Sequence, residues 1–329
     1  MDGIKGEGAL SADELLSARE RIEAVINNIE QVIAGKKEVV ELVVLALLSE
    51  GHVLIEDVPG VGKTTLVSSL AKSIEGEFKR IQFTPDTMPS DITGFSIYNQ
   101  KTGDFEFRTG AAMSNIVLAD EINRTSAKTQ ASLLEIMEEK QVTVDSHTYK
   151  MKRPYMVLAT QNPIEYLGTY PLPEAQIDRF MIKLSVGYPS FADEMHFVQH
   201  GKKAKQKLSS VMNAAEVIRL IGLAEKVEVS DMVNRYIVGI VTATRTHPDL
   251  LLGSSPRGSI ALHGIARAYA LYQGRSYVIP DDVKYLAPYV LGHRIQLNHE
   301  AKTKKLKTRD VIGAILQEII VPISPSAAK

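Results

Sequence analysis

The stretch Pro59-Gly60-Val61-Gly62-Lys63-Thr64-Thr65 decides how this chain is expected to fold. It lies between a short apolar run, His52–Glu56, and a segment with helical patterning, Lys63–Ser73. Inward-facing backbone amides can cradle a phosphate group, and glycines let the chain curl without a clash of Cβ atoms. Because this turn connects a strand to a helix, it predicts a nucleoside triphosphate site; a plain glycine turn with a surface lysine is the alternative.

The residues of this phosphate loop have separate expected tasks. The amides that would hold phosphate oxygens belong to Gly60, Val61, Gly62, Lys63, Thr64 and Thr65. Lys63 would reach the β- and γ-phosphates, and the Thr64 hydroxyl would ligate Mg²⁺. The full pattern asks for a glycine five positions before Gly62, where this chain has Asp57, so the match is incomplete. The expected cofactors are a nucleoside triphosphate and Mg²⁺.

Two carboxylates follow a second apolar run, Ile116–Ala119. A buried strand in this place would deliver Asp120 and Glu121 to the edge of the sheet beside the phosphate loop. Asp120 would then join the Mg²⁺ ligands, and Glu121 would orient or deprotonate the attacking water. A strand that ends in Asp-Glu can also be a simple solvated strand end. The phosphate loop favours the catalytic interpretation.

A neutral amide follows a third apolar run, Tyr155–Thr160, in the sequence Gln161-Asn162-Pro163. The Asn162 side chain could hold the attacking water or the γ-phosphate without adding charge. An asparagine before proline is also common in turns, and the residues alone leave both readings open.

Short apolar strands alternate with helical segments in the first part of the chain. The expected strands are Val53–Glu56, Lys79–Phe83, Asn115–Ala119, Tyr155–Thr160 and Met181–Leu184, with helices over Lys63–Ser73 and Ser126–Glu139. This alternation predicts the α/β class, with a parallel sheet covered by helices on both faces. Two hairpins are expected as surface additions to this core, at Gly94–Arg108 and Gln141–Lys152.

Helical patterns dominate both ends of the chain. Ser11 and Glu14 match a capping box before a helix that runs to about Ile33, and a second helix is expected over Lys36–Glu50. Beyond Tyr188-Pro189-Ser190 the strand signals stop, and the expected helices are Phe191–Lys205, Asn213–Ala224, Ser230–Thr246, Pro256–Gln273, Pro280–Leu291 and Thr308–Ile319. We therefore expect a disordered tail over 1–10, an α/β core over 11–188, and a smaller all-α domain over 189–329.

Composition excludes several classes of protein. The 329 residues contain 38 Lys and Arg, 39 Asp and Glu, and no cysteine. Disulfide frameworks, thiolate metal sites and cysteine nucleophiles are excluded, and the net charge of -1 argues against a basic nucleic-acid footprint over the whole molecule. The longest uncharged apolar run, Leu42–Leu48, predicts no membrane span. Met1–Leu10 does not resemble a secretory signal, so a cytoplasmic location is expected.

With the three polar elements in this order, the sequence resembles the MoxR family of AAA+ ATPases. The resemblance extends from about Ile22 to Leu297 and is carried by the stretches Ile55–Thr64, Pro89–Gly94, Leu118–Arg124, Ala159–Glu165 and Gly168–Phe180. It implies an AAA+ core followed by a helical lid domain. The substitution at Asp57 leaves the resemblance intact, because MoxR-like proteins often lack that glycine.

The resemblance also implies roles for single residues. Asn162 falls on the sensor 1 position, Arg179 on the arginine finger that reaches a neighbouring subunit's γ-phosphate, and Arg257 on sensor 2 of the lid. Residues around Ile33, in Val32–Gly35, lie where the family contacts adenine. The two hairpins correspond to insertions that usually face the pore of a ring. Plain surface or helix-start ion pairs are the alternatives for both arginines.

Other charged residues are less specific. Arg124 could contact an adjacent subunit's nucleotide or pair with Glu121, and the sequence leaves this open. Two lysine clusters are expected to be solvated faces or loops; they comprise Lys202, Lys203, Lys205 and Lys207, and Lys302, Lys304, Lys305 and Lys307.

The resemblance implies a protein-remodelling ATPase that assembles with itself into an ATP-dependent ring, expected to be a hexamer. Its implied partner has a von Willebrand factor A domain, and the outcome could be metal-cofactor insertion or maturation of a complex. A nucleic-acid-binding module controlled by ATP is the alternative, since the hairpins carry basic and aromatic residues, although acidic residues dilute their charge. A small-molecule kinase would fit the phosphate loop but not Asn162, Arg179 and the helical lid together.

Overall fold

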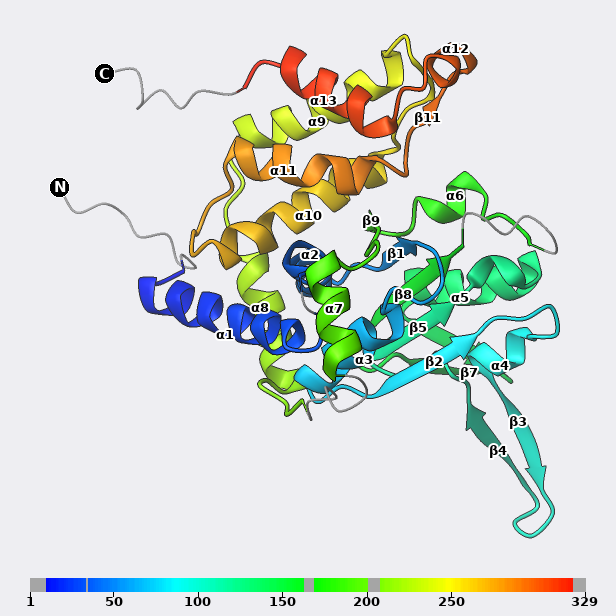
Figure 1. Cartoon of the computed structure of the whole chain (residues 1–329). Coiled ribbons are helices and arrows are strands. Elements are labelled where there is room, and N and C mark those ends of the chain that lie inside the picture. Colours follow the sequence, from blue (N-terminus) through cyan, green and yellow to red (C-terminus); the bar gives the residue numbers. More distant parts are fainter. Residues whose placement is uncertain (1–9, 34, 163–168, 201–207, 322–329) are drawn as a thin grey trace. The chain divides into compact units, whose positions relative to one another are not determined.

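The computed structural model describes residues 10–33, 35–162, 169–200 and 208–321 (Figure 1). The chain divides into two compact units. The sheet unit comprises Ala24–Phe180 and Leu184–Ile218, and the helical unit comprises Met1–Glu23, Met181–Lys183 and Arg219–Lys329. The boundary expected between residues 188 and 189 stays a prediction.

A five-stranded sheet carries the predicted site. Its strands are β1 (Val53–Glu56), β2 (Phe78–Gln82), β5 (Ile116–Asp120), β8 (Met156–Gln161) and β9 (Ile182–Leu184), in the order β2-β5-β8-β1-β9. The pairs β2–β5, β5–β8 and β8–β1 are all parallel. Nearly every residue of β1, β5 and β8 is buried, as expected for strands covered on both faces. The α/β class with a parallel sheet flanked by helices is confirmed.

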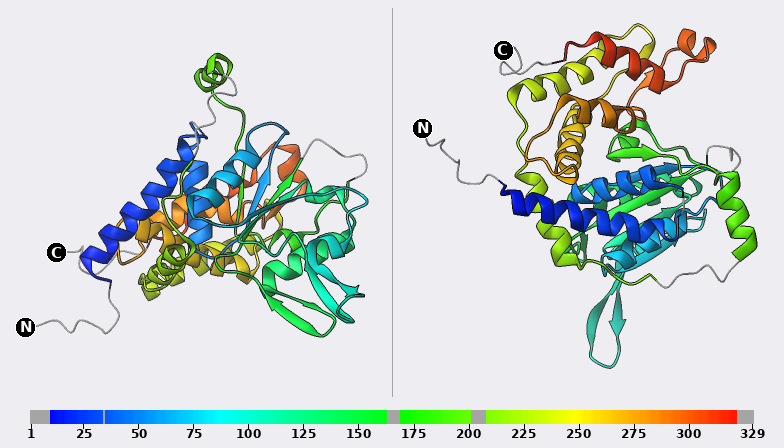
Figure 2. Two further views of the ribbon diagram at one scale, coloured as in Figure 1. Left: turned by 90° about the horizontal axis from the view of Figure 1, so that it is seen from below. Right: turned by 60° about the vertical axis from the view of Figure 1, so that its left-hand side comes forward.

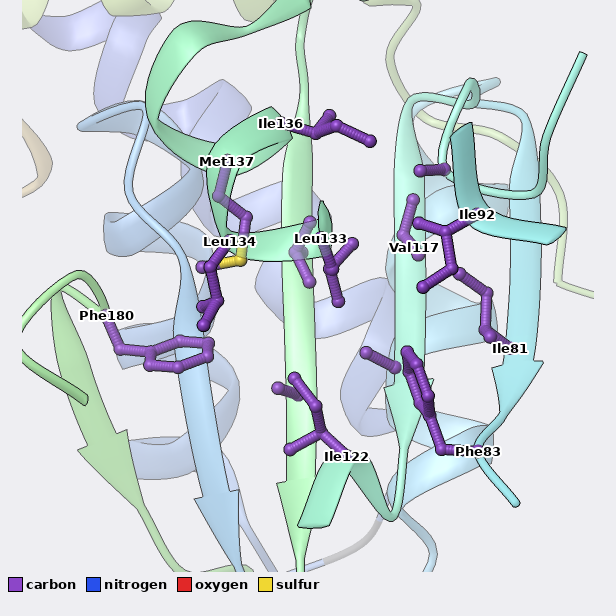
Figure 3. Close-up of a cluster of buried hydrophobic side chains, with 14 of the residues drawn as sticks. Ile81, Phe83, Ile92, Val117, Ile122, Leu133, Leu134, Ile136, Met137 and Phe180 are labelled. Atoms are coloured by element: carbon purple, nitrogen blue, oxygen red, sulfur yellow. The ribbon is translucent and has the colours of Figure 1, made fainter. Parts of the chain in front are cut away.

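The helices of this part of the chain include those that the apolar patterns indicate, and the short α4 and α6 in addition. They are α1 (Ala12–Glu30), α2 (Lys37–Leu48), α3 (Lys63–Ser73), α4 (Pro89–Thr93), α5 (Ala127–Glu139), α6 (Glu174–Ile177) and α7 (Phe191–His200), with a 3₁₀ turn at Ile122–Arg124. Figure 3 shows the core cluster in which Leu133, Leu134 and Met137 of α5 lie with Val117 of β5 and with Phe180. All five residues are at most 2% exposed, so α5 packs onto the sheet through a buried apolar layer.

Both predicted hairpins are present. The first consists of β3 (Gly94–Asn99) and β4 (Asp104–Thr109), and it projects from the rest of the sheet unit (Figures 1 and 2). The second consists of β6 (Gln141–Val144) and β7 (His147–Lys150). The two contact each other through stacked rings of Phe107 and Tyr149, whose centroids are 4.0 Å apart.

The later part of the chain is mainly helical. Its helices are α8 (Ala214–Glu225), α9 (Asp231–Thr246), α10 (Pro256–Tyr272), α11 (Pro280–Leu291), α12 (His299–Thr303) and α13 (Thr308–Glu318). The expectation that strands stop after residue 190 is wrong in one place. β10 (Leu250–Leu252) and β11 (Gln296–Leu297) form an antiparallel pair that is too short to give a periodic sequence signal.

Some expectations fall on residues outside the described part of the chain. These are residues 1–9 of the expected tail, Ala34, residues 163–168 after Asn162, and the lysine cluster at Lys202, Lys203, Lys205 and Lys207. Among the described residues, the helices are all too short or too polar to span a bilayer.

Candidate active site

The predicted functional segments leave the same edge of the sheet. Strand β8 lies between β1 and β5, and the register pairs Glu56 with Gln161 and Ala119 with Ala159. The phosphate loop follows β1, the two carboxylates end β5, and Asn162 follows β8. Because the carboxyl ends of parallel strands share one edge, these three segments come together there.

The phosphate loop has the backbone that an anion cradle needs. Gly60 and Gly62 have φ angles of +87° and +92°, a region that favours glycine. Gly62 is the N-cap of α3, and the Leu66 amide donates to the Gly62 carbonyl at 2.9 Å. The amides before Leu66 therefore precede the helical hydrogen-bond ladder. A Cβ on Gly60 would meet nothing within 4 Å, so the space beside the loop is open at this position.

Lys63 is held over the loop by the loop's own carbonyl groups. Its ammonium group donates to the carbonyl oxygens of Asp57 at 3.0 Å and Val58 at 3.1 Å. An ammonium group has three N–H donors, so one remains for an anion. Thr64 and Thr65 are exposed at the start of α3. Ile33 is only 7% exposed, and its Cδ1 would lie 3.8 Å from a Cβ built on Gly62, which places it against this loop.

Asp120 is buried, and both of its carboxylate oxygens accept hydrogen bonds. Its Oδ1 accepts a hydrogen bond from the Thr160 hydroxyl at 2.6 Å. Its Oδ2 accepts from Arg80, from Nη2 at 2.6 Å and from Nε at 3.1 Å. A carboxylate and a hydroxyl such as that of Thr64 are hard oxygen ligands of the kind that Mg²⁺ prefers. The donor set therefore fits Mg²⁺, and Arg80 shares the same carboxylate.

Glu121 is fixed by its backbone and by its side chain. Its φ of +58° is left-handed, which costs a non-glycine residue about 1 kcal/mol. The Glu121 amide donates to the Thr160 hydroxyl at 2.8 Å, and its Oε2 accepts from Gln82 Nε2 at 2.8 Å. Arg124 Nη1 lies 3.4 Å from the same Oε2, so Arg124 does pair with Glu121. The contact of Arg124 with an adjacent subunit's nucleotide stays a prediction.

The remaining predicted residues have defined positions. Asn162 is buried, 8% exposed, directly after β8. Arg179 follows α6, and its Nη2 forms an ion pair with Glu138 Oε2 of α5 at 3.0 Å. Arg257 is exposed in the first turn of α10, where its amide donates to the Ser255 hydroxyl at 3.1 Å. Arg257 belongs to the helical unit, and its sensor role stays a prediction.

Sequence reasoning missed three side chains that contact the carboxylates. Arg80 and Gln82 lie two positions apart on β2, so they point to the same face of the sheet. Arg80 Nη2 also donates to Gln82 Oε1 at 2.6 Å, which joins the two. The signal in the sequence is the placement of two polar residues, Arg80 and Gln82, on either side of the buried Ile81. Thr160 ends an apolar run, and this pattern predicts only that it belongs to the strand.

Comparison with known proteins agrees with this geometry. Residues 52–182 match the family model described as "ATPase family associated with various cellular activities (AAA)". Residues 242–315 match the model of the AAA lid domain. The first match contains all of the segments that meet at the sheet edge, and the second contains Arg257.

Similar proteins extend over nearly the whole chain. A protein of Bacillus subtilis named YeaC and described as uncharacterized is 53% identical over 92% of this chain and 96% of its own length. Chaperone MoxR1 of Mycobacterium tuberculosis is 40% identical over 94% of this chain and 85% of its own. A crystal structure assigned as an ATPase, from Cytophaga hutchinsonii, aligns with a TM-score of 0.89 at 39% identity, over 94% of this chain and 98% of that one.

Proposed function

The chain belongs to the MoxR family of AAA+ ATPases, and from this premise we propose that it hydrolyses ATP at a site completed by a neighbouring copy and remodels a partner protein. The observation that supports the proposal is that the segments with Lys63, with Asp120 and Glu121, and with Asn162 all lie at the carboxyl ends of parallel strands, at one edge of the sheet. A lone glycine turn or a lone acidic strand end would leave the other segments unexplained.

The residues of the sheet unit supply binding and orientation. The amides of the phosphate loop and the third N–H of Lys63 would hold the phosphate oxygens. Thr64 and Asp120 would ligate Mg²⁺, which when bound neutralises charge on the phosphate oxygens. Asn162 would hold the γ-phosphate or the water beside it. These groups position the reactants before any bond is broken.

Glu121 would act on the attacking water. Its carboxylate would orient the water and accept one of its protons as the oxygen attacks phosphorus and the bond to ADP breaks. Thr160 and Gln82 fix its backbone and its side chain, so the carboxylate is already oriented. The Gln82 side-chain amide donates a hydrogen bond to Oε2 of Glu121, so the water would share the carboxylate with Gln82.

Arg179 would act on the nucleotide of the next subunit. A guanidinium placed near the γ-phosphate offsets charge that develops in the transition state. In this structure Arg179 is paired with Glu138 of its own subunit, so this ion pair has to open before Arg179 reaches a neighbour. Hydrolysis would therefore depend on assembly of an ATP-dependent ring, proposed to be a hexamer.

The remodelling part of the proposal is supported by the name of one relative, Chaperone MoxR1. A partner with a von Willebrand factor A domain, and metal-cofactor insertion as the result, extend that proposal on family resemblance. A cytoplasmic location belongs with it as a prediction.

Three variants test the catalytic assignment. Lys63→Ala should lose nucleotide binding, whereas Lys72→Ala, an exposed lysine on the same helix, should keep it. Glu121→Gln should bind ATP and lower turnover by about 10²-fold or more, because it loses the proton acceptor. Calorimetric ATP binding and phosphate release measure the two effects. Retained hydrolysis by purified Glu121→Gln would remove Glu121 from the mechanism.

A further inference from the structure

Asp57 occupies the place where the phosphate-binding pattern asks for glycine, and its side chain is only 7% exposed. The carboxylate accepts hydrogen bonds from the Ser185 hydroxyl at 3.0 Å, from the Val186 amide, and from the Gly187 amide at 3.2 Å. These three donors form a short segment between β9 and α7, here called the 185–187 segment. A glycine at position 57 could accept none of these bonds through a side chain.

The backbone of Asp57 faces the phosphate loop. Its carbonyl oxygen accepts from Lys63 Nζ at 3.0 Å, and its amide donates to the Gln161 carbonyl at 3.2 Å. A single residue therefore touches the lysine expected to bind phosphate, the end of β8 that precedes Asn162, and the 185–187 segment. The side chain anchors the residue, and the carbonyl group aims Lys63.

We propose that Asp57 is a positioning residue that couples nucleotide binding at the phosphate loop to the order of the 185–187 segment. The inference rests on the proposed function, because it needs a nucleotide at Lys63. Charge-assisted hydrogen bonds to a buried carboxylate are roughly twice as strong as neutral ones, and loss of the acceptor leaves backbone amides unsatisfied. The 185–187 segment thus holds the carbonyl group that orients the ammonium group of Lys63.

Thermodynamic reciprocity gives the proposal its test. If the ordered 185–187 segment favours nucleotide binding through Asp57, then bound nucleotide must favour the ordered segment by the same factor. A second contact of the same stretch of chain provides a comparison. Lys36 Nζ donates to the Tyr188 carbonyl at 2.8 Å and does not pass through Asp57.

The experiment measures hydrogen exchange of the Val186 and Gly187 amides, with and without ADP and Mg²⁺, together with the ADP dissociation constant. In the wild-type chain ADP should slow exchange at both amides. Asp57→Gly restores the glycine of the motif, yet it should bind ADP about 10-fold more weakly and lose the ADP-dependent slowing. Lys36→Ala should keep that slowing, and Asp57→Asn, which retains an acceptor oxygen, should keep part of it.

Several results would overturn the coupling. Wild-type protein that binds ADP with unchanged exchange at Val186 and Gly187 refutes it. So does Asp57→Gly with wild-type ADP affinity and the same slowing, since Asp57 would then be only a structural contact. If Asp57→Gly does not fold, Asp57→Asn and the wild-type measurement decide. Wild-type protein that binds no nucleotide would instead overturn the proposed function and this inference with it.

Discussion

Thr160 joins the two carboxylates of the candidate site. Its hydroxyl donates to Asp120 Oδ1 at 2.6 Å and accepts from the Glu121 amide at 2.8 Å, and the residue is fully buried. One hydroxyl group therefore fixes both the side chain expected to ligate Mg²⁺ and the backbone of the expected catalytic base. Arg80 and Gln82 hold the same carboxylates from β2.

The Thr160 contact can be tested with two substitutions. Thr160→Val has nearly the same shape but leaves a buried carboxylate oxygen and a partly buried amide without partners, so it should destabilise the fold by about 1–3 kcal/mol. Its turnover should fall more than its affinity for ATP, because Glu121 loses its orientation. Thr160→Ser should recover most of both properties. Urea unfolding and steady-state kinetics measure these effects, and equal turnover in all three proteins would contradict the role of Thr160.

His52 gives the sheet unit a pH-dependent stability. Its Nε2 lies 3.0 Å from the Met137 carbonyl and its Nδ1 accepts from the Val157 amide, so the neutral ring bridges α5 and β8. Burial lowers the pKa of His52 from 6.5 to about 4, since desolvation penalises the charged imidazolium. The unfolded chain therefore binds the proton more readily than the folded chain between those two values.

The free energy of unfolding should accordingly fall as the pH drops from 6.5 towards 4. Above pH 6.5 the stabilisation from neutral His52 should be fully present. The whole loss from this residue is on the order of 3 kcal/mol, at about 1.4 kcal/mol for each unit of pKa difference. His52→Asn, which does not titrate, should lose less stability over this range. Urea midpoints at pH 7 and pH 5 test this, and parallel losses in both proteins would show that His52 is not the cause.

Among single residues, the sequence alone identifies some members of the candidate site and misses others. Lys63, Asp120 and Glu121 could be picked out because each follows an apolar run at a recognisable offset. Arg80 and Thr160 could not, because their roles come from register between strands far apart in sequence. Asp57 was recognised only as a departure from a motif, since its partners lie about 130 residues further along the chain.

At the scale of elements, the base of the β3–β4 hairpin requires a glycine at position 94. Gly94 has a φ of +94°, and a Cβ there would lie 2.4 Å from the Arg108 carbonyl oxygen and 2.7 Å from the Gly110 amide nitrogen. Gly94 directly follows α4 and pairs with Thr109, so the backbones approach closely at the point where the hairpin begins. Gly103, at the tip, has a φ of +76° and nothing within 4 Å of a built Cβ.

Substitution of each glycine by alanine gives a matched pair of variants. Gly94→Ala adds a backbone clash to an unfavourable φ, so it should destabilise the sheet unit by several kcal/mol and expose the hairpin to protease. Gly103→Ala has only the cost of the φ angle, about 1 kcal/mol. Thermal unfolding and limited proteolysis compare them. Equal effects would show that the close approach at Gly94 is unimportant.

Long elements were predictable because their periodic patterns and end signals agree. The capping box at the start of α1 is present, with Ser11 and Glu14 exchanging hydrogen bonds at 2.8 and 3.2 Å. α11 spans Pro280–Leu291 as predicted, because Pro280 suits the first helical position. Short elements such as α4, β10 and β11 were not predictable, since they have too few residues to show a period.

At the scale of the whole molecule, the sequence indicated the α/β core and the family, and the family models and the relatives confirm both. Assembly is a property of more than one chain, so neither the sequence nor a single copy defines the ring. Arg179 connects the single chain with the proposed ring. It forms an ion pair with Glu138 of its own subunit, whereas its proposed target is the nucleotide of the next subunit.

A mixing experiment tests the central claim that a neighbouring copy completes the ATP site. Arg179→Ala and Glu121→Gln should each bind ATP and hydrolyse little of it when alone. An equal mixture contains sites that combine an intact Glu121 with an intact Arg179 from the adjoining subunit, so phosphate release should rise well above that of either variant. A mixture no more active than its components, or Arg179→Ala with wild-type turnover, would contradict the claim.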